Sequence, residues 1–287
     1  MASLAGVLFD GFAYGMLLFL LSVGLSVTLG MMNFVNLAHL SFGMVGGYTV
    51  VKVTNDLGWP FLAGLPLAFL SAAVVAVVLE RLLFRRLYRA TDLDQCLLSI
   101  GIVFVSVAVA AWLFGTVQQP VTTPAWLHGT VNLLGLQLGA YRLFLICVSL
   151  VVTVLLVWSL ERTRFGAQVR AAVDNQRMAR GLGIDVDRAF AITFALGGGL
   201  AGLGGALSVS MIGGIDHAFA FTYLVYVLIV VAVGGLGSIG GSFIAATVLG
   251  ISDMAGKYYF PQLGAFLIYL VMVGLLMWRP LGLFGKR

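Results

Sequence analysis

The polar residues that could contact a small solute lie inside one of the most apolar stretches of the chain. The segment MMNFVNLAHLSFGMVGGY sits within residues 11–51, a run with no Lys, Arg, Asp or Glu. An asparagine amide both donates and accepts hydrogen bonds, which suits a zwitterion or an amide. On this interpretation the residues that line a route for substrate are Asn33, Asn36, His39 and Ser41.

A structural role explains the same residues. About 20 apolar residues cross a bilayer, so residues 11–51 are too long for one straight span. We expect a first span near 11–30, a break near the asparagines and a second segment near 38–51. Such a break frees backbone groups, which an amide or an imidazole can satisfy. Both roles remain open for this segment.

The composition requires a lipid environment. The 287-residue chain is 61% hydrophobic and 9% charged, with a mean hydropathy of +1.08, whereas soluble domains are about 25% charged. The apolar runs are continuous, which predicts helices and not a β-barrel. The N-terminal run lacks a basic n-region and a cleavage site, so we expect it to be retained. Cys96 and Cys147 are isolated, which predicts neither a disulfide framework nor a metal site.

The apolar segments predict an all-α integral membrane protein, a polytopic bundle of about eight to nine segments within a single domain (1–287). Some of these segments are expected to be broken or re-entrant. The polar stretch 116–140 is expected to be a loop. The remaining apolar segments are 61–79, 95–115, 141–160, 189–212, 221–233, 243–256 and 263–279.

Lys and Arg are concentrated in the loops 80–94 and 161–188 and in the C-terminal tail. By the positive-inside rule these parts are cytoplasmic and the N-terminus is outside. The net charge of +5 then reflects basic cytoplasmic loops. It does not indicate nucleic acid as a partner.

The loop 161–188 contains a predicted helix, RFGAQVRAAVDNQRMARGLGI, that is too polar to enter the membrane. It could lie on the bilayer surface with its arginines facing anionic lipid. It could instead dock a soluble partner, because a hairpin between two spans does not need a helix of this length.

Small residues recur in FALGGGLAGLGGAL (194–207), including Gly198-x-x-x-Gly202. Such spacing lets helices approach closely, so we expect helix packing there, with a small-residue lining of a pathway as the alternative. A weak echo between LAHLSFGMVGGYTV and GSIGGSFIAATVLG suggests an internal repeat, in which broken helices would mark the substrate route.

Three further polar residues have two interpretations each. Asp253 could relay a proton, but Lys257 follows closely and favours a position at the outer interface. Asp216 and His217 belong either to a solvated outer loop or to a surface on which a solute-binding protein docks.

Three blocks of the sequence resemble one family. RTRFGAQVRAAVDNQRMARGLGIDVDRAFAITFALGGGLAGLGGAL (162–207) looks like the signature region of the branched-chain amino acid ABC transporter permeases. GLSVTLGMMNFVNLAHLSFGMVGGY and GGLGSIGGSFIAATVLG resemble two further family blocks, and the similarity covers essentially the whole chain. After the Ala-His pair this chain has Leu40-Ser41, where the family commonly has an acidic or small residue.

The resemblance implies an ATP-driven importer of the bacterial cytoplasmic (inner) membrane. The implied partners are a second homologous permease, two cytoplasmic ATPase subunits, a periplasmic solute-binding protein and membrane lipid. The implied coupling helix is 166–183, which meets the ATPase through Arg170, Ala171, Ala172, Met178, Gly181 and Gly183.

This chain has no G-x-x-x-x-G-K-[ST] motif, so no cofactor is expected in it and ATP would be bound by the partner subunits. It would have no catalytic residues. Branched-chain or related amino acids are the expected substrate. Urea, short amides and small organic acids are alternatives within the same machinery. An ion-coupled secondary transporter is the rival outside it.

Overall fold

The computed structural model describes residues 4–32, 34–88, 90–133 and 136–285. Almost all of them are helical, and six helices are long and apolar enough to cross a membrane. The predicted all-α membrane bundle is thereby confirmed.

The elements follow one another in two sets, separated by a small hairpin. The first set is α1 (Leu4–Met32), α2 (His39–Val51), the π-helical turn η1 (Lys52–Asp56), α3 (Phe61–Leu82), η2 (Phe84–Leu87) and α4 (Asp92–Phe114). The connection that follows holds η3 (Ala125–Leu127), β1 (Thr130–Leu133) and β2 (Leu136–Gly139). The second set is α5 (Ala140–Arg162), α6 (Arg164–Asp174), α7 (Gln176–Gly181), α8 (Val186–Ile212), α9 (Phe219–Gly234), α10 (Ile239–Tyr259) and α11 (Gly264–Trp278).

Most predicted helix ends differ from the observed ones by a few residues, and α1 begins at Leu4, seven residues before the expected start. Three further differences change an element. The stretch 116–140 is not a plain loop, because β1 and β2 pair antiparallel, with Val131 opposite Leu138. The segment predicted at 243–256 extends to a 21-residue helix, since the glycines before it form a tight turn and then continue into the helix. The predicted single helix 166–183 is two helices, α6 and α7, divided at Asn175.

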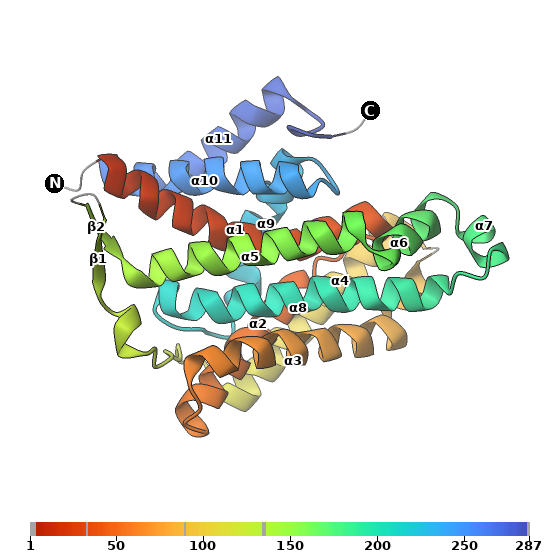
Figure 1. Ribbon diagram of the computed structural model, residues 1–287, viewed down its shortest axis with the longest axis horizontal. Coiled ribbons are helices and arrows are strands. Elements are labelled where there is room, and N and C mark those ends of the chain that lie inside the picture. Colours follow the sequence, from red (N-terminus) through yellow and green to blue (C-terminus); the bar gives the residue numbers. More distant parts are fainter. Residues whose placement is uncertain (1–3, 33, 89, 134–135, 286–287) are drawn as a thin grey trace.

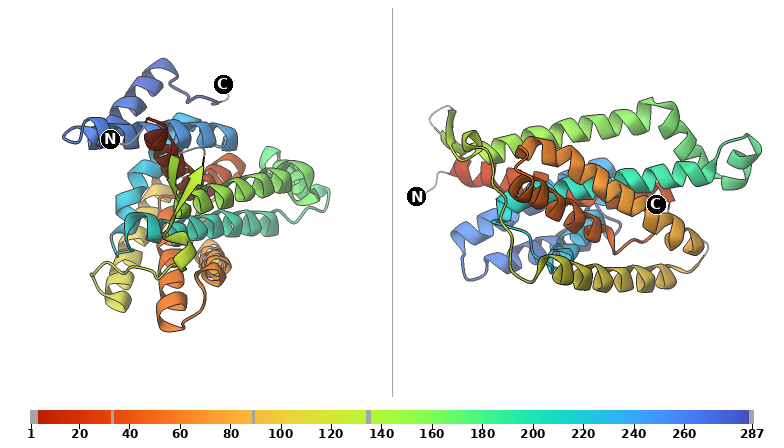
Figure 2. Two further views of the ribbon diagram at one scale, coloured as in Figure 1. Left: turned by 60° about the vertical axis from the view of Figure 1, so that its left-hand side comes forward. Right: turned by 90° about the horizontal axis from the view of Figure 1, so that it is seen from below.

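The long helices run along the long axis of the molecule (Figure 1). The pair α6 and α7 lies at one end, and the N-terminus and the β-hairpin lie at the other. Figure 2 shows α11 projecting from the bundle and α4 running along its edge. The basic loop that carries α6 and α7 is therefore remote from the N-terminus.

The core is built on close contacts between small residues. A Cβ added at Gly15 of α1 would lie 2.7 Å from the Ala246 carbonyl oxygen of α10. A Cβ at Gly202 of α8 would lie 2.7 Å from the Ala68 carbonyl oxygen of α3. Backbones this close leave no room for lipid between helices, and in membranes such packing takes the place of a hydrophobic driving force.

The bundle contains two sets of helices with matching neighbours. Helix α1 packs on α10 as α8 packs on α3, and α2 packs on α3 as α9 packs on α10. α1 and α8 run in opposite directions along the long axis (Figure 1). The helices α1–α3 are thus an inverted counterpart of α8–α10, an arrangement common in transporters, and α4 and α11 complete the two halves. The sequence echo, which matched residues 37–50 to 237–250, made α10 the counterpart of α2, whereas the packing makes α9 the counterpart of α2.

Candidate transport and coupling sites

The break between α1 and α2 returns the chain into the bundle. The amide of Ala38 donates to Asn36 Oδ1 at 3.0 Å, and the amide of His39 donates to the Asn36 carbonyl at 3.4 Å. The side chain and backbone of Asn36 thus form the turn that starts α2. Asn33 lies outside the described residues.

His39 connects this turn to α1. Its Nε2 lies 3.1 Å from the Leu21 carbonyl oxygen, which only accepts, so Nε2 carries the proton and donates. A Cβ at Gly24 would lie 2.8 Å from His39 Cε1, so the imidazole fits only because position 24 is glycine. Asn36 and His39 are each 1% exposed, so neither side chain is open to solvent or lipid in this conformation.

Two polar atoms at this break have no protein partner among the described residues, Asn36 Nδ2 and His39 Nδ1. One is a donor and the other an acceptor. Buried polar atoms such as this amide nitrogen and this imidazole nitrogen normally have a hydrogen-bond partner. Contact with a passing solute therefore stays a prediction for Asn36 and His39, alongside the structural role that their other hydrogen bonds show.

Ser41 points toward a different helix. Its hydroxyl lies 2.7 Å from Ser106 Oγ of α4. Gln95 of α4 also supports the break, since its Oε1 accepts from the amide of Val35 at 3.0 Å. Sequence reasoning missed Gln95, a residue 3% exposed, although a glutamine inside an apolar segment is a signal for such a role.

A second break, residues 213–218, precedes α9. The amide of Phe219 donates to the Asp216 carbonyl at 3.3 Å, the same turn that Asn36 makes before α2. The amides and carbonyls of Gln119 and Ile215 bond reciprocally at 2.8 and 2.9 Å, so the α4–α5 connection holds this break in place. Asp216 and His217 are half-buried here, as part of a helix-starting turn and not of a freely solvated loop.

Gly198 and Gly202 lie against α3. A Cβ on either glycine would overlap an alanine side chain of α3, Ala76 or Ala72. Both glycines therefore face a protein neighbour in this conformation.

The coupling segment has a break of its own. Thr163 Oγ1 accepts from the amide of Gly166 at 3.2 Å and caps α6. Asn175 Oδ1 accepts from the amide of Met178 at 3.0 Å and caps α7. Asparagine is among the best N-cap residues, and this is why one predicted helix becomes two. Gly183 then ends α7 with φ of 81°, a left-handed conformation that glycine adopts most readily.

The predicted coupling residues differ in how they are placed. Arg170 donates from its guanidinium to the Leu160 carbonyl, and Ala172 is wholly buried. Met178 is 66% exposed and Leu182 is 79% exposed, which leaves an apolar surface on α7. Ala171 is half-buried, and Gly181 and Gly183 are exposed.

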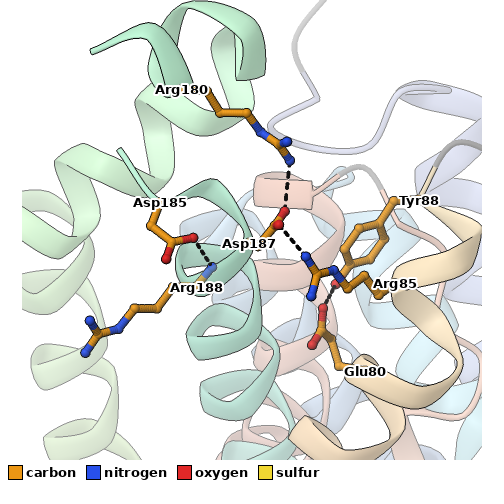
Figure 3. Close-up of polar contacts among 7 residues, drawn as sticks. All are labelled: Glu80, Arg85, Tyr88, Arg180, Asp185, Asp187 and Arg188. Atoms are coloured by element: carbon orange, nitrogen blue, oxygen red, sulfur yellow. Dashed lines mark hydrogen bonds and ion pairs between the residues drawn. The ribbon is translucent and has the colours of Figure 1, made fainter. Parts of the chain in front are cut away.

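One carboxylate ties α7 to the bundle (Figure 3). Asp187, in the first turn of α8, accepts from Arg180 of α7 at 2.8 Å and also from Arg85 of η2. Isolated surface pairs contribute little, but one acid shared by two guanidinium groups is a network. This network links α7 to α8 and to the α3–α4 connection.

A buried acid supports the α3 side of this network. Tyr88 donates to Glu80 Oε1 at 2.6 Å, and Glu80 is 1% exposed. Burial and this hydrogen bond raise the pKa of Tyr88 above its ordinary value, so the hydroxyl keeps its proton. Figure 3 shows both residues beside Arg85.

Comparison with known proteins decides the family. The profile described as "Branched-chain amino acid transport system / permease component" matches residues 7–276. The chain belongs to this permease family. That membership confirms the resemblance seen in the three sequence blocks and, with six apolar helices, makes this a multi-pass membrane protein.

Relatives of this permease align over nearly the whole chain. The probable branched-chain amino acid transport permease protein LivH of Methanocaldococcus jannaschii is 27% identical over 285 residues, covering 95% of this chain and 90% of that protein. The high-affinity branched-chain amino acid transport system permease protein BraD of Pseudomonas aeruginosa is 24% identical, covering 97% and 95%. An autoinducer 2 import system permease protein, LsrC of Salmonella paratyphi B, is 32% identical over 42% of this chain.

Proposed function

We propose that this permease is the membrane subunit of an ATP-driven importer that moves branched-chain or related amino acids from periplasm to cytoplasm by alternating access. It would sit in the bacterial inner membrane with a second homologous permease, two ATPase subunits and a periplasmic binding protein. The chain itself carries no catalytic residue in this scheme. ATP hydrolysis belongs to the partner subunits.

The observation that carries the proposal is the pair α6 and α7. It lies at the end of the bundle that is rich in arginine, exposes Met178 and Leu182 and is anchored through Asp187. A soluble protein pressing on α7 would move a short helix that is capped by Asn175, ended by Gly183 and tied to α8 through Asp187. That is what coupling to a cytoplasmic ATPase requires.

A second surface supports the proposal that this chain pairs with a homologous permease. Helices α4 and α11 have large exposed apolar side chains, among them Trp112 at 83% and Met277 at 82% exposure. Lipid covers some of this area. A route for solute that opens between two permeases would run along these helices.

The test is uptake of labelled leucine by proteoliposomes that contain the assembled complex, with and without ATP. Replacing both Met178 and Leu182 by Glu is expected to abolish ATPase binding and ATP-dependent uptake, because two charges face an apolar contact. Trp126→Glu is the matched control for ATPase binding, since Trp126 is 57% exposed in η3, remote from α7. Uptake that continues without ATP would contradict the proposal.

The same assay addresses the alternatives. If the complex transports urea, a short amide or a small organic acid in place of leucine, the mechanism proposed here stays the same and only the substrate differs. For the ion-coupled rival, the residue to test is Asp253, which is fully buried in α10 and paired with Lys257 at 2.6 Å. Uptake driven by a proton gradient and lost in Asp253→Asn would favour that rival.

A further inference from the structure

A groove enters the bundle between α2, α3 and α4. It has a volume of about 570 Å³ and is lined almost entirely by aliphatic and aromatic side chains. Helices α3 and α4 make little contact with each other across it among the described residues. On the α4 wall Val105 is 64% exposed and Leu113 is 55% exposed, so the groove opens sideways toward the surroundings of the bundle.

The polar groups inside the groove are mostly satisfied by the protein. Ser106 Oγ bonds Ser41 and donates to the Val103 carbonyl at 2.8 Å. Thr49 Oγ1 donates to the Val45 carbonyl at 2.8 Å. The walls therefore present hydrocarbon and offer water few partners, which is the condition under which a cavity stays dry.

The two ends of the groove differ. Lys52 and Tyr48 lie at one end, four residues apart and so on one face of the helix. The ammonium of Lys52 lies 5.8 Å from the Phe114 ring, and Tyr48 stacks on that ring at 4.1 Å. The hydroxyl of Tyr48 is buried and has no hydrogen-bond partner among the described residues. The opposite end is apolar.

The length of the groove matches one leaflet of a bilayer. Its α4 wall runs from Ile102 to Phe114, about 18 Å at 1.5 Å per residue. Half of the hydrocarbon core is about 15 Å. One end therefore lies near the headgroup level, at Lys52, and the other near the bilayer centre.

We propose that this groove binds one acyl chain of a phospholipid from the leaflet remote from α6 and α7. The phosphate lies beside Lys52, which extends its ammonium to the headgroup level. The chain fills the space between α3 and α4 that no side chain occupies. This site depends on the membrane location of the chain and is independent of which solute is transported.

The test is native mass spectrometry of the full-length permease, purified in mild detergent with its partners and titrated with palmitoyl-oleoyl phosphatidylglycerol. We expect one lipid to stay bound after the annular lipids are lost. Val109→Trp fills the groove and should lower retention about tenfold or more, since an occupied volume excludes the chain. Leu155→Trp on α5, also exposed, is the matched control and should leave retention unchanged.

The headgroup end is tested separately. Lys52→Ala should lower retention about fivefold, the effect of one basic residue near a lipid phosphate. Tyr48→Phe keeps the stacked ring and removes a hydroxyl that is closed off from the groove, so it should leave retention unchanged. Asp56→Asn frees Lys52 from its 2.7 Å ion pair and should not lower retention. Wild-type protein that retains no lipid would overturn the proposal. So would a Val109→Trp variant that retains as much lipid as the wild type. A photocrosslink from an azide-bearing residue at position 109 to a second subunit would also overturn it.

Discussion

The two inverted halves of the bundle share the packing of their first three helices and differ at the fourth, because α11 packs on α10 whereas α4 makes little contact with α3 among the described residues. Between α2, α3 and α4 there is an open apolar groove. Between α9, α10 and α11 the corresponding space holds tyrosine rings, with Tyr226 centred 6.0 Å from Tyr223 and 6.4 Å from Tyr269. In the second half, side chains of the protein thus occupy the space between the helices. In the first half, the proposed lipid chain occupies it.

Each half also carries a Lys–Asp pair four residues apart near the end remote from α6. Lys52 and Asp56 are about half exposed. Asp253 is wholly buried beneath Lys257, with Oδ1 unpaired among the described residues. Both halves share close backbone contacts between small residues, and they differ in the side chains between the helices. The shared contacts therefore account for the shared arrangement of the helices. The side chains between the helices are free to serve different roles in each half.

The largest expected effect tests whether the small-residue contacts are equivalent in the two halves. Gly15→Ala on α1 and Gly202→Ala on α8 should each lower the free energy of unfolding by about 2–3 kcal/mol, because the methyl overlaps backbone of the facing helix. Thermal unfolding in detergent measures both. Gly101→Ala on α4 and Gly274→Ala on α11 are the controls. Neither position has an atom within 4 Å of the added Cβ, so a neutral result or a small gain is expected.

The next effect separates the two ion pairs. Lys257→Met should cost about 2 kcal/mol, below the range for a fully buried pair because the lysine is half exposed. Lys52→Met should cost less than about 1 kcal/mol, as exposed pairs do. Chemical denaturation of both variants gives the comparison. Equal costs would show that the buried acid is not held by Lys257.

A smaller difference is expected between the two breaks. Asn36→Ala removes the buried acceptor of the Ala38 amide and should cost about 1–2 kcal/mol. Asp216→Ala, in the matching turn before α9, should cost about 0.5 kcal/mol or less, since the side chain is only half-buried. If the two variants were equally destabilised, the Asp216 side chain would be supporting its turn as well.

The smallest effect concerns side-chain hydrogen bonds to the outer helices. Ser106→Ala removes the bond from α4 to Ser41 of α2 and should cost about 0.6 kcal/mol, the average for such bonds between membrane helices. Tyr269→Phe on α11 keeps the ring that packs on Tyr226 of α9 and should cost less. A clearly larger loss for Ser106→Ala would mean that this bond, and not the groove's occupant, holds α4 in place.

Much of the fold could be predicted from apolar length alone. The break before His39 follows from a charge-free run too long for one span, and α2 begins within one residue of the expected position. The division of the coupling segment could not be predicted from helix propensity, because the N-cap hydrogen bond of Asn175 outweighs it. The structural equivalence of α2 and α9 appears only from packing between distant segments. The matching turns at Asn36 and Asp216 share too few residue types to reveal this equivalence in the sequence.

The site was predictable only in part. The polarity of Asn36 and His39 marked the break, but the sequence did not show that both would be buried, nor that His39 would bond α1. Asp187 has no feature that distinguishes it from neighbouring charges. Its role appears only when Arg85, about a hundred residues earlier, reaches the same carboxylate.

The burial of α1 has a consequence for how the protein is made. Ser26 of α1 bonds Ser242 of α10 at 2.6 Å, across 216 residues of chain. At ribosomal rates of about 5–20 residues per second, α10 emerges roughly 10–40 s after that part of α1. During that interval α1 must remain in the bilayer or at the insertion machinery without the α10 partner of Ser26, while Ser22 and Thr28 bond carbonyls of α1 itself. Its first helix therefore has to be stable in lipid before the core that will bury it exists.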